Sequence, residues 1–220
     1  MPLQVWNAFG ELIVDGNNIN LFLRHAGTVS GGTYPQITVP AVRPYVFFRP
    51  LAASGQLLGV QRSGGLATIT FSGPSEYYVF DGPAVSGGGL DGWNAAGEHV
   101  FTSRQRPLNV IGGVVVPNYT TAYRMAYADG WSYAGLSSGK WAYNVTYLRE
   151  GLNTFGSSPA PFTTFLYRER ITATANGFHA SFGQTAIEYP AWGGPNNRNE
   201  FNALGETCYV SMIDVSGVVT

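Results

Sequence analysis

A nine-residue phrase occurs twice in this chain of 220 residues and constrains its fold more than any other feature. Residues 3–11 read LQVWNAFGE, and residues 90–98, shifted by 87 positions, read LDGWNAAGE. Six of the nine residues are identical, where composition alone gives roughly one match, so the phrase indicates an internal duplication. The alignment continues beyond the phrase, because Leu21 then matches Leu108. We therefore expect two related units.

A glycine-rich break separates the two copies. Residues 86–89 read SGGG, and such a sequence predicts a flexible connection just before the second copy. The break and the repeat agree on an N-terminal β domain in residues 1–86 and a C-terminal β domain in residues 87–220. The second domain is longer, and its excess forms an aromatic-rich insertion at about residues 118–161.

The pattern of apolar residues predicts strands. Short apolar or alternating runs are interrupted every 8–12 residues by Gly, Pro, Asn or Ser, which is typical of a β-sandwich or barrel. Clear candidates are residues 45–49, 67–71, 77–80, 141–147 and 207–215. We expect an all-β protein made of two related antiparallel β-sandwich-like domains.

Charged residues make up only 11% of the chain, whereas 45% of it is apolar. Such a chain folds, but its surface must consist largely of Gly, Ser, Thr, Asn and Tyr. Lys140 is the only lysine beside eleven arginines, and protein interfaces favour Arg over Lys. Packing against other subunits explains this bias, and so does a GC-rich genome.

Several classes of function lack a signal. The net charge is −1 without a basic run, so we expect no nucleic-acid partner. No run approaches the ~20 apolar residues of a membrane span, and the N-terminus does not resemble a secretory signal. Cys208 is the only cysteine and lies in an apolar run, which favours a buried, inert thiol.

Catalytic and metal-binding patterns are also missing. The three histidines, His25, His99 and His179, are far apart in sequence and show no ligand spacing. We expect no enzyme, no cofactor and no metal. A glycosidase pair could still form among the carboxylates, for which the candidates are Asp81, Asp91, Glu98, Glu188 and Glu206. The run RER at residues 168–170 is interpreted as a solvated or inter-subunit ion-pair cluster.

The most aromatic segment is residues 123–147, with seven aromatic residues. Asp129–Gly130 predicts a two-residue hairpin turn in it, which would place rings on both faces of a ribbon. One face can join the core, while the other must contact something else, although a one-residue slip would put all the rings on one face. The candidate receptor or partner contacts are Trp131, Tyr133, Trp141 and Tyr143. Core packing of these rings is the alternative.

The repeated phrase itself predicts a strand, a turn and a return strand. The Asn of the phrase forms the turn, and its Gly relieves steric strain in the turn. Glu11 and Glu98 follow at the strand end. We interpret Trp6 and Trp93 as equivalent core anchors, with surface binding by this pair as the alternative.

The phrase also carries a resemblance. Residues 2–15, PLQVWNAFGELIVD, resemble the opening of small tail proteins of long-tailed, siphovirus-like bacteriophages, and residues 212–217, MIDVSG, are similar to their close. The second copy departs from the pattern, because Asp91–Gly92 replaces Gln–Val and Thr102 replaces Asp15.

The resemblance implies a non-enzymatic structural component of the virion tail, in the tail tip, baseplate or fibre, assembled in the host cytoplasm. Its implied partners are other phage tail proteins, further copies of itself, with a trimer favoured by analogy, and a host cell-surface glycan or protein receptor. The alternative function is a carbohydrate- or receptor-binding module that uses exposed aromatic rings. A polysaccharide depolymerase would need a carboxylate pair in a groove.

Overall fold

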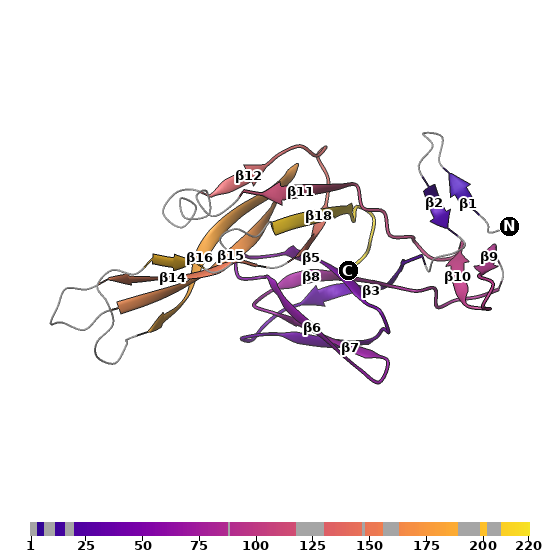
Figure 1. The fold of residues 1–220 in the computed structure, drawn as a ribbon, viewed down its shortest axis with the longest axis horizontal. Helices are drawn as coiled ribbons and strands as arrows, with labels where there is room; N and C mark the ends of the chain where they lie inside the picture. The colour runs from indigo at the N-terminus through magenta and orange to yellow at the C-terminus, as the bar shows by residue number, and fades with distance from the viewer. Residues whose placement is uncertain are drawn as a thin grey trace.

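The computed structural model describes residues 4–6, 12–15, 20–87, 89–117, 130–146, 148–155, 163–188, 199–201 and 208–220. These residues form strands and turns without a helix, so the all-β prediction is confirmed (Figure 1). No helix that could cross a membrane occurs in this part of the chain. The strands are β1 (Gln4–Trp6), β2 (Leu12–Asp15), β3 (Phe22–Val29), β4 (Gln36–Pro40), β5 (Tyr45–Pro50), β6 (Leu57–Ser63), β7 (Leu66–Phe71), β8 (Ser75–Asp81), β9 (Asp91–Trp93), β10 (His99–Thr102), β11 (Gly112–Val116), β12 (Trp131–Tyr133), β13 (Trp141–Val145), β14 (Glu150–Phe155), β15 (Thr163–Thr174), β16 (Gly177–Glu188), β17 (Asn199–Phe201) and β18 (Cys208–Asp214).

A six-stranded antiparallel sheet forms the centre of the molecule, in the order β11-β18-β13-β5-β8-β3. Three of its strands precede the boundary predicted near residue 87, and three follow it. The two sets meet where β13 pairs with β5, with Tyr143 opposite Phe48. The two segments therefore share one continuous sheet across that boundary.

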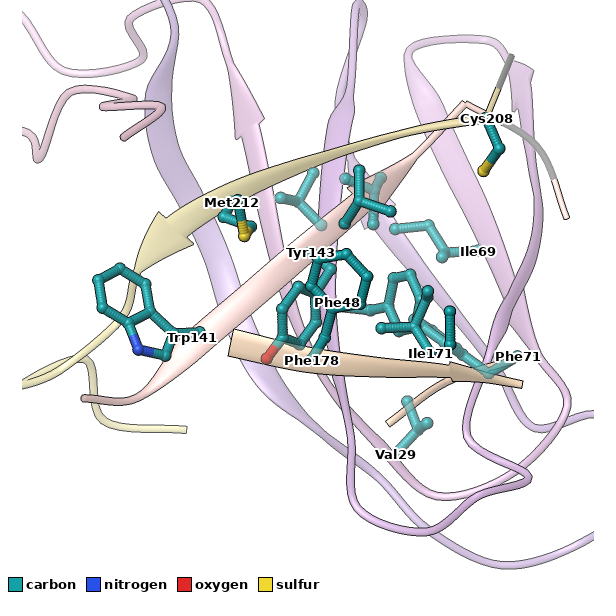
Figure 2. Close-up of a cluster of buried hydrophobic side chains, with 14 of the residues drawn as sticks. Val29, Phe48, Ile69, Phe71, Trp141, Tyr143, Ile171, Phe178, Cys208 and Met212 are labelled. Carbon is teal, nitrogen blue, oxygen red and sulfur yellow. The ribbon is translucent and has the colours of Figure 1, made fainter. Parts of the chain in front are cut away.

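Two further sheets complete the main core. Their orders are β4-β7-β6 and β12-β16-β15-β14-β17. Side chains of both sheets join one face of the six-stranded sheet in a single cluster, in which Ile69 of β7 and Phe178 of β16 accompany Tyr143 and Met212 (Figure 2). The strands alternate as a pleated sheet requires, so this sandwich-like core draws on both segments of the chain.

The strand order of the first segment recurs in the second. Strands β3-β8-β5 form half of the central sheet in the same order as β11-β18-β13, and the outer sheet β4-β7-β6 matches β12-β16-β15. The hairpins β1–β2 and β9–β10 correspond as well. Strands β14 and β17 have no counterpart among the described residues of the first segment. An internal duplication predicts this correspondence.

The opposite face of the six-stranded sheet carries a smaller apolar cluster. Phe47, Tyr78 and Ile213 are buried there, and Val215 belongs to the same cluster. The C-terminal segment returns along this sheet, and the Thr220 hydroxyl contacts Glu76 at 3.1 Å.

Glu76 is the centre of an ionic group on this face. Its carboxylate lies 2.8 Å from Lys140 and 3.5 Å from Arg49, and it accepts a hydrogen bond from the Tyr78 hydroxyl at 3.1 Å. Burial alone would raise the pKa of Glu76, but the hydrogen bonds from Lys140 and Tyr78 lower it below its usual value. The only lysine of the chain thus ties the start of β13 to β8.

A second ion pair lies inside the protein. Arg149 and Glu169 are both buried, and two guanidinium nitrogens contact the two carboxylate oxygens at 2.9 and 2.6 Å. Arg149 also donates to the carbonyl of Pro117 at 2.5 Å. The interpretation of residues 168–170 as a solvated cluster is therefore wrong for Glu169. In a strand the middle residue of three points to the opposite face from its neighbours, and here that face is the interior.

A glutamine side chain links the two outer sheets. Gln56 is buried just before β6, and its amide both donates to the carbonyl of Ile171 and accepts from its N–H, each at 2.9 Å. The pairing of β14 with β15 ends at Arg168, so the edge of β15 is open at Ile171. The amide of Gln56 satisfies both backbone groups there, as a neighbouring strand would.

Candidate functional site

Three of the four aromatic residues expected to make contacts gather around one ring instead. The ring centroid of Phe178 lies 5.9 Å from Trp131, 5.8 Å from Tyr133 and 5.7 Å from Tyr143. These distances are typical of edge-to-face and tilted aromatic packing in a core. Trp141 belongs to the same buried cluster (Figure 2).

Trp141 and Tyr143 are buried, which corrects the expectation that they present rings to a ligand. The Tyr143 hydroxyl donates to the carbonyl of Gly177 at 2.5 Å, and burial raises its pKa to about 12. Both side chains point from β13 toward the outer sheet, where no ligand outside the protein can stack on them. Trp141 and Tyr143 therefore pack in the core, which was the alternative expectation.

Trp131 and Tyr133 are only half-buried. They lie on β12, an edge strand, where Tyr133 pairs directly with Phe178. Gly177 permits this approach, because a Cβ there would meet the carbonyl oxygen of Tyr133 at 1.9 Å. The predicted hairpin turn begins at Asp129, which lies outside the described residues, as do the earlier aromatic residues of the segment.

The repeated phrase folds as a hairpin in both copies. Strand β1 pairs with β2 and β9 with β10, and each residue pair of the first hairpin recurs 87 positions later in the second. Trp6 lies opposite Leu12, and Trp93 lies opposite His99. The register shift also falls at the same place in both. The two hairpins lie at the same end of the molecule, to the right in Figure 1.

The turn of the second hairpin is built as its sequence predicts. The Asn94 side-chain oxygen accepts hydrogen bonds from the N–H groups of Ala96 at 3.0 Å and Glu98 at 2.9 Å. Gly97 has a φ of 79°, a conformation that glycine adopts without steric cost. The turn role predicted for Asn94, Gly97 and Glu98 is confirmed, whereas Glu11 lies outside the described residues.

Trp93 does not act as a core anchor. Its side chain is 55% exposed and stacks on His99, with ring centroids 5.1 Å apart. The side chain of Trp6 lies outside the description. A strand of three residues in a two-stranded hairpin has no second layer to cover its ring, so the prediction for Trp93 is wrong.

Asp91 holds the base of the same hairpin. It accepts a hydrogen bond from the Gly87 N–H at 2.5 Å and lies 3.2 Å from the His99 ring. The Gly87 N–H, followed by the Thr102 hydroxyl and His99, lowers the pKa of the Asp91 carboxyl. The Asp91 carboxylate therefore has a structural role at the base of the hairpin.

Two of the remaining candidates for chemistry, Asp81 and His179, also have structural partners. Asp81 accepts hydrogen bonds from the N–H groups of Val42 and Arg43 at 2.5 and 3.1 Å. His179 contacts the hydroxyl of its cross-strand neighbour Ser132 at 2.8 Å, and within the described residues it makes no hydrogen bond to a carboxylate. The side chains of Glu188 and Glu206 lie outside the description.

No metal site emerges from the part of the chain that the structure describes, because no three His, Cys, Asp or Glu side chains there come together. Cys208 is buried in the main core, as expected.

No family model matches this chain, and neither curated proteins nor solved structures include a match.

Proposed function

We propose that this protein is a non-enzymatic structural component of a phage tail, in the tip, baseplate or fibre, and that it assembles through its hairpin end. One observation carries the proposal: the second copy of the repeated phrase forms a hairpin whose tryptophan is exposed rather than part of the core. Trp93 presents more than half of its surface there. Large exposed aromatic residues of this kind are typical of protein contacts.

The composition agrees with this role. The chain has few charges and a single lysine, and apolar side chains besides Trp93 remain exposed near the hairpins. Leu90, directly before β9, is 58% exposed, and Val85 is exposed in the connection that precedes it. Burial of such a surface between copies would contribute about 25 cal/mol for each Å² of apolar area.

The proposal is tested by the size of the protein in solution, measured by light scattering coupled to gel filtration over a range of concentrations. We expect a homo-oligomer. Trp93→Ala should weaken it by at least roughly thirtyfold in dissociation constant, the effect of losing a central aromatic contact. Leu66→Ala is the matched control, because Leu66 is 46% exposed on another sheet.

A protein that stays monomeric at every concentration would contradict the assembly role, as would equal effects of the two substitutions. Circular dichroism should show the same melting temperature for Trp93→Ala within a few degrees, since an exposed side chain contributes little to stability.

The second candidate function is a carbohydrate- or receptor-binding module. The four predicted rings do not favour it, because two are buried and two pack against Phe178. An exposed tyrosine at a different place, Tyr34, does favour it.

A further inference from the structure

Two neighbouring clefts open beside the junction of the two outer sheets. The first has a volume of about 620 Å³ and lies among Leu57, Leu58 and Leu148. The second has a volume of about 460 Å³. Tyr34 and Arg168 line both clefts, so one extended ligand could occupy them together. Volumes of this size are typical of sites for small ligands.

The second cleft has polar groups in its lining. Hydroxyl and amide groups surround it, supplied by Ser54, Ser72, Gln184 and Thr185. The Ser72 and Thr185 hydroxyls donate to the carbonyls of Ser54 and Leu166 and keep acceptor lone pairs, whereas the Ser54 hydroxyl and the Gln184 amide can both donate and accept. The lining therefore suits a ligand that carries several hydroxyl groups.

Tyr34 stands between the clefts in an unusual conformation. Its φ is 60°, and it is the only non-glycine residue with a positive φ among the described residues. Proline follows it, although a residue before proline normally takes an extended conformation. Such a backbone is energetically unfavourable, and strain of this kind concentrates at ligand sites.

Packing of the tyrosine ring does not explain that strain, because Tyr34 is 57% exposed. The loop is held at its end, where the carbonyl of Pro35 accepts a hydrogen bond from the Phe71 N–H at 2.9 Å. The fold thus holds an exposed aromatic ring between two cavities at an energetic cost.

Arg170 supplies positive charge to the second cleft. Among the described residues its guanidinium makes one long hydrogen bond, to the carbonyl of Gln184 at 3.4 Å. The guanidinium lies over Gly183, where a Cβ would meet it at 1.3 Å. Arg168, by contrast, is already paired with Glu150. Arg170 therefore keeps N–H donors for a ligand, and its planar fork matches a carboxylate.

We propose that the two clefts bind an oligosaccharide that carries a carboxylate, an inference that rests on the second candidate function. The ring of Tyr34 stacks on the apolar face of one sugar. The hydroxyl and amide groups of the second cleft bind sugar hydroxyls, and Arg170 binds the acidic group. A sugar ring has an apolar face and a rim of hydroxyls, which is the combination that this site offers.

The test is an array of immobilised acidic and neutral oligosaccharides, probed with the full-length protein and three variants. We expect wild-type protein to bind acidic members of the array. Tyr34→Gly should weaken that binding by at least tenfold, and Arg170→Gln should remove the preference for acidic over neutral sugars. Absence of binding to any member, or unchanged binding by Tyr34→Gly, would overturn the proposal.

Thermal melting separates a binding role of Tyr34 from a structural one. Because glycine adopts a positive φ freely, Tyr34→Gly should melt at the same temperature as wild type or higher. A lower melting temperature together with weaker binding would assign Tyr34 to folding and overturn the proposal.

The third variant, Trp93→Ala, separates the two functions. It should lose oligomerisation and keep sugar binding, whereas Tyr34→Gly should do the reverse. Sugar binding by a protein that is always monomeric would refute the assembly role alone, and an oligomer that binds no sugar would refute only this site.

Discussion

The two segments of the chain, β1–β8 and β9–β18, follow the same strand order, yet the second extends its outer sheet by two strands that do not occur in the described part of the first. The outer sheet of the first segment ends at β6, beside which Gln56 reaches across to β15. In the second segment β14 and β17 continue the sheet beyond β15. The added strands bring a buried charge with them, because Arg149 directly precedes β14 and pairs with Glu169 of β15.

The difference between the two halves accounts for some of the polar side chains in the interior. Apolar side chains fill both halves of the main core, and strand pairing satisfies most backbone groups. Three of the buried polar side chains, Gln56, Arg149 and Glu169, lie where the two halves differ, at the open edge of β15 and at the start of β14. Substitutions at these two places should show which features depend on the strand order that both halves share and which depend on the strands found in only one half.

The largest effect is expected from breaking the buried ion pair. Arg149→Met leaves the Glu169 carboxylate buried without its partner, which should lower the free energy of unfolding by roughly 3–5 kcal/mol. The double variant Arg149→Met/Glu169→Leu should regain most of that loss, because it leaves no buried charge. Denaturation in guanidinium chloride measures both.

Arg62→Met is the matched control, since Arg62 is exposed on β6, the edge strand of the first outer sheet. If Arg149→Met lowers the free energy of unfolding no more than Arg62→Met does, strands β14 and β17 do not depend on the buried ion pair.

A smaller effect is expected at the link between the halves. Gln56→Leu removes both hydrogen bonds to Ile171 and should cost about 2–3 kcal/mol, because a buried N–H and a buried carbonyl lose their partners. Amide exchange at Ile171 should also become faster, which nuclear magnetic resonance can follow. Gln61→Leu, at an exposed position of β6, should change neither quantity.

The smallest effect concerns pH and the central sheet. Lys140 and Tyr78 hold the pKa of Glu76 below its usual value of 4.5, so this carboxylate stabilises the fold above that pH. The contribution should be lost as the pH falls through the lowered pKa of the folded state. Thermal melting below pH 4.5 should therefore decline more steeply for wild type than for Glu76→Gln. Parallel curves would show that the ionic group does not join the two halves.

Much of the secondary structure was predictable because its signals are local. The strands predicted at residues 45–49, 67–71 and 77–80 correspond to β5, β7 and β8, since alternating apolar residues and turn residues act over a few positions. The turn at Asn94 and Gly97 was predictable for the same reason. Glu169 also had a usable signal, since the alternation of residues 168–170 in a strand puts it on the other face.

The candidate sites were less predictable. Tyr34 carries no sequence signal, because its φ depends on how the loop between β3 and β4 closes. Trp93 and Trp141 are both aromatic residues in short strands, but only Trp141 has a second layer of strands above it. The choice of β13 as the partner of β5 joins residues nearly a hundred positions apart, beyond the reach of any local pattern.

The sequence by itself determined that this chain forms short antiparallel strands, that one hairpin occurs twice in the same register, and where its turns fall. Only the tertiary structure decided that both segments share one sheet, that Tyr143 is covered while Trp93 is not, and that Glu169 meets Arg149. The physical reason is range: backbone preference and alternation act between neighbours, whereas burial depends on which distant strand provides the covering layer.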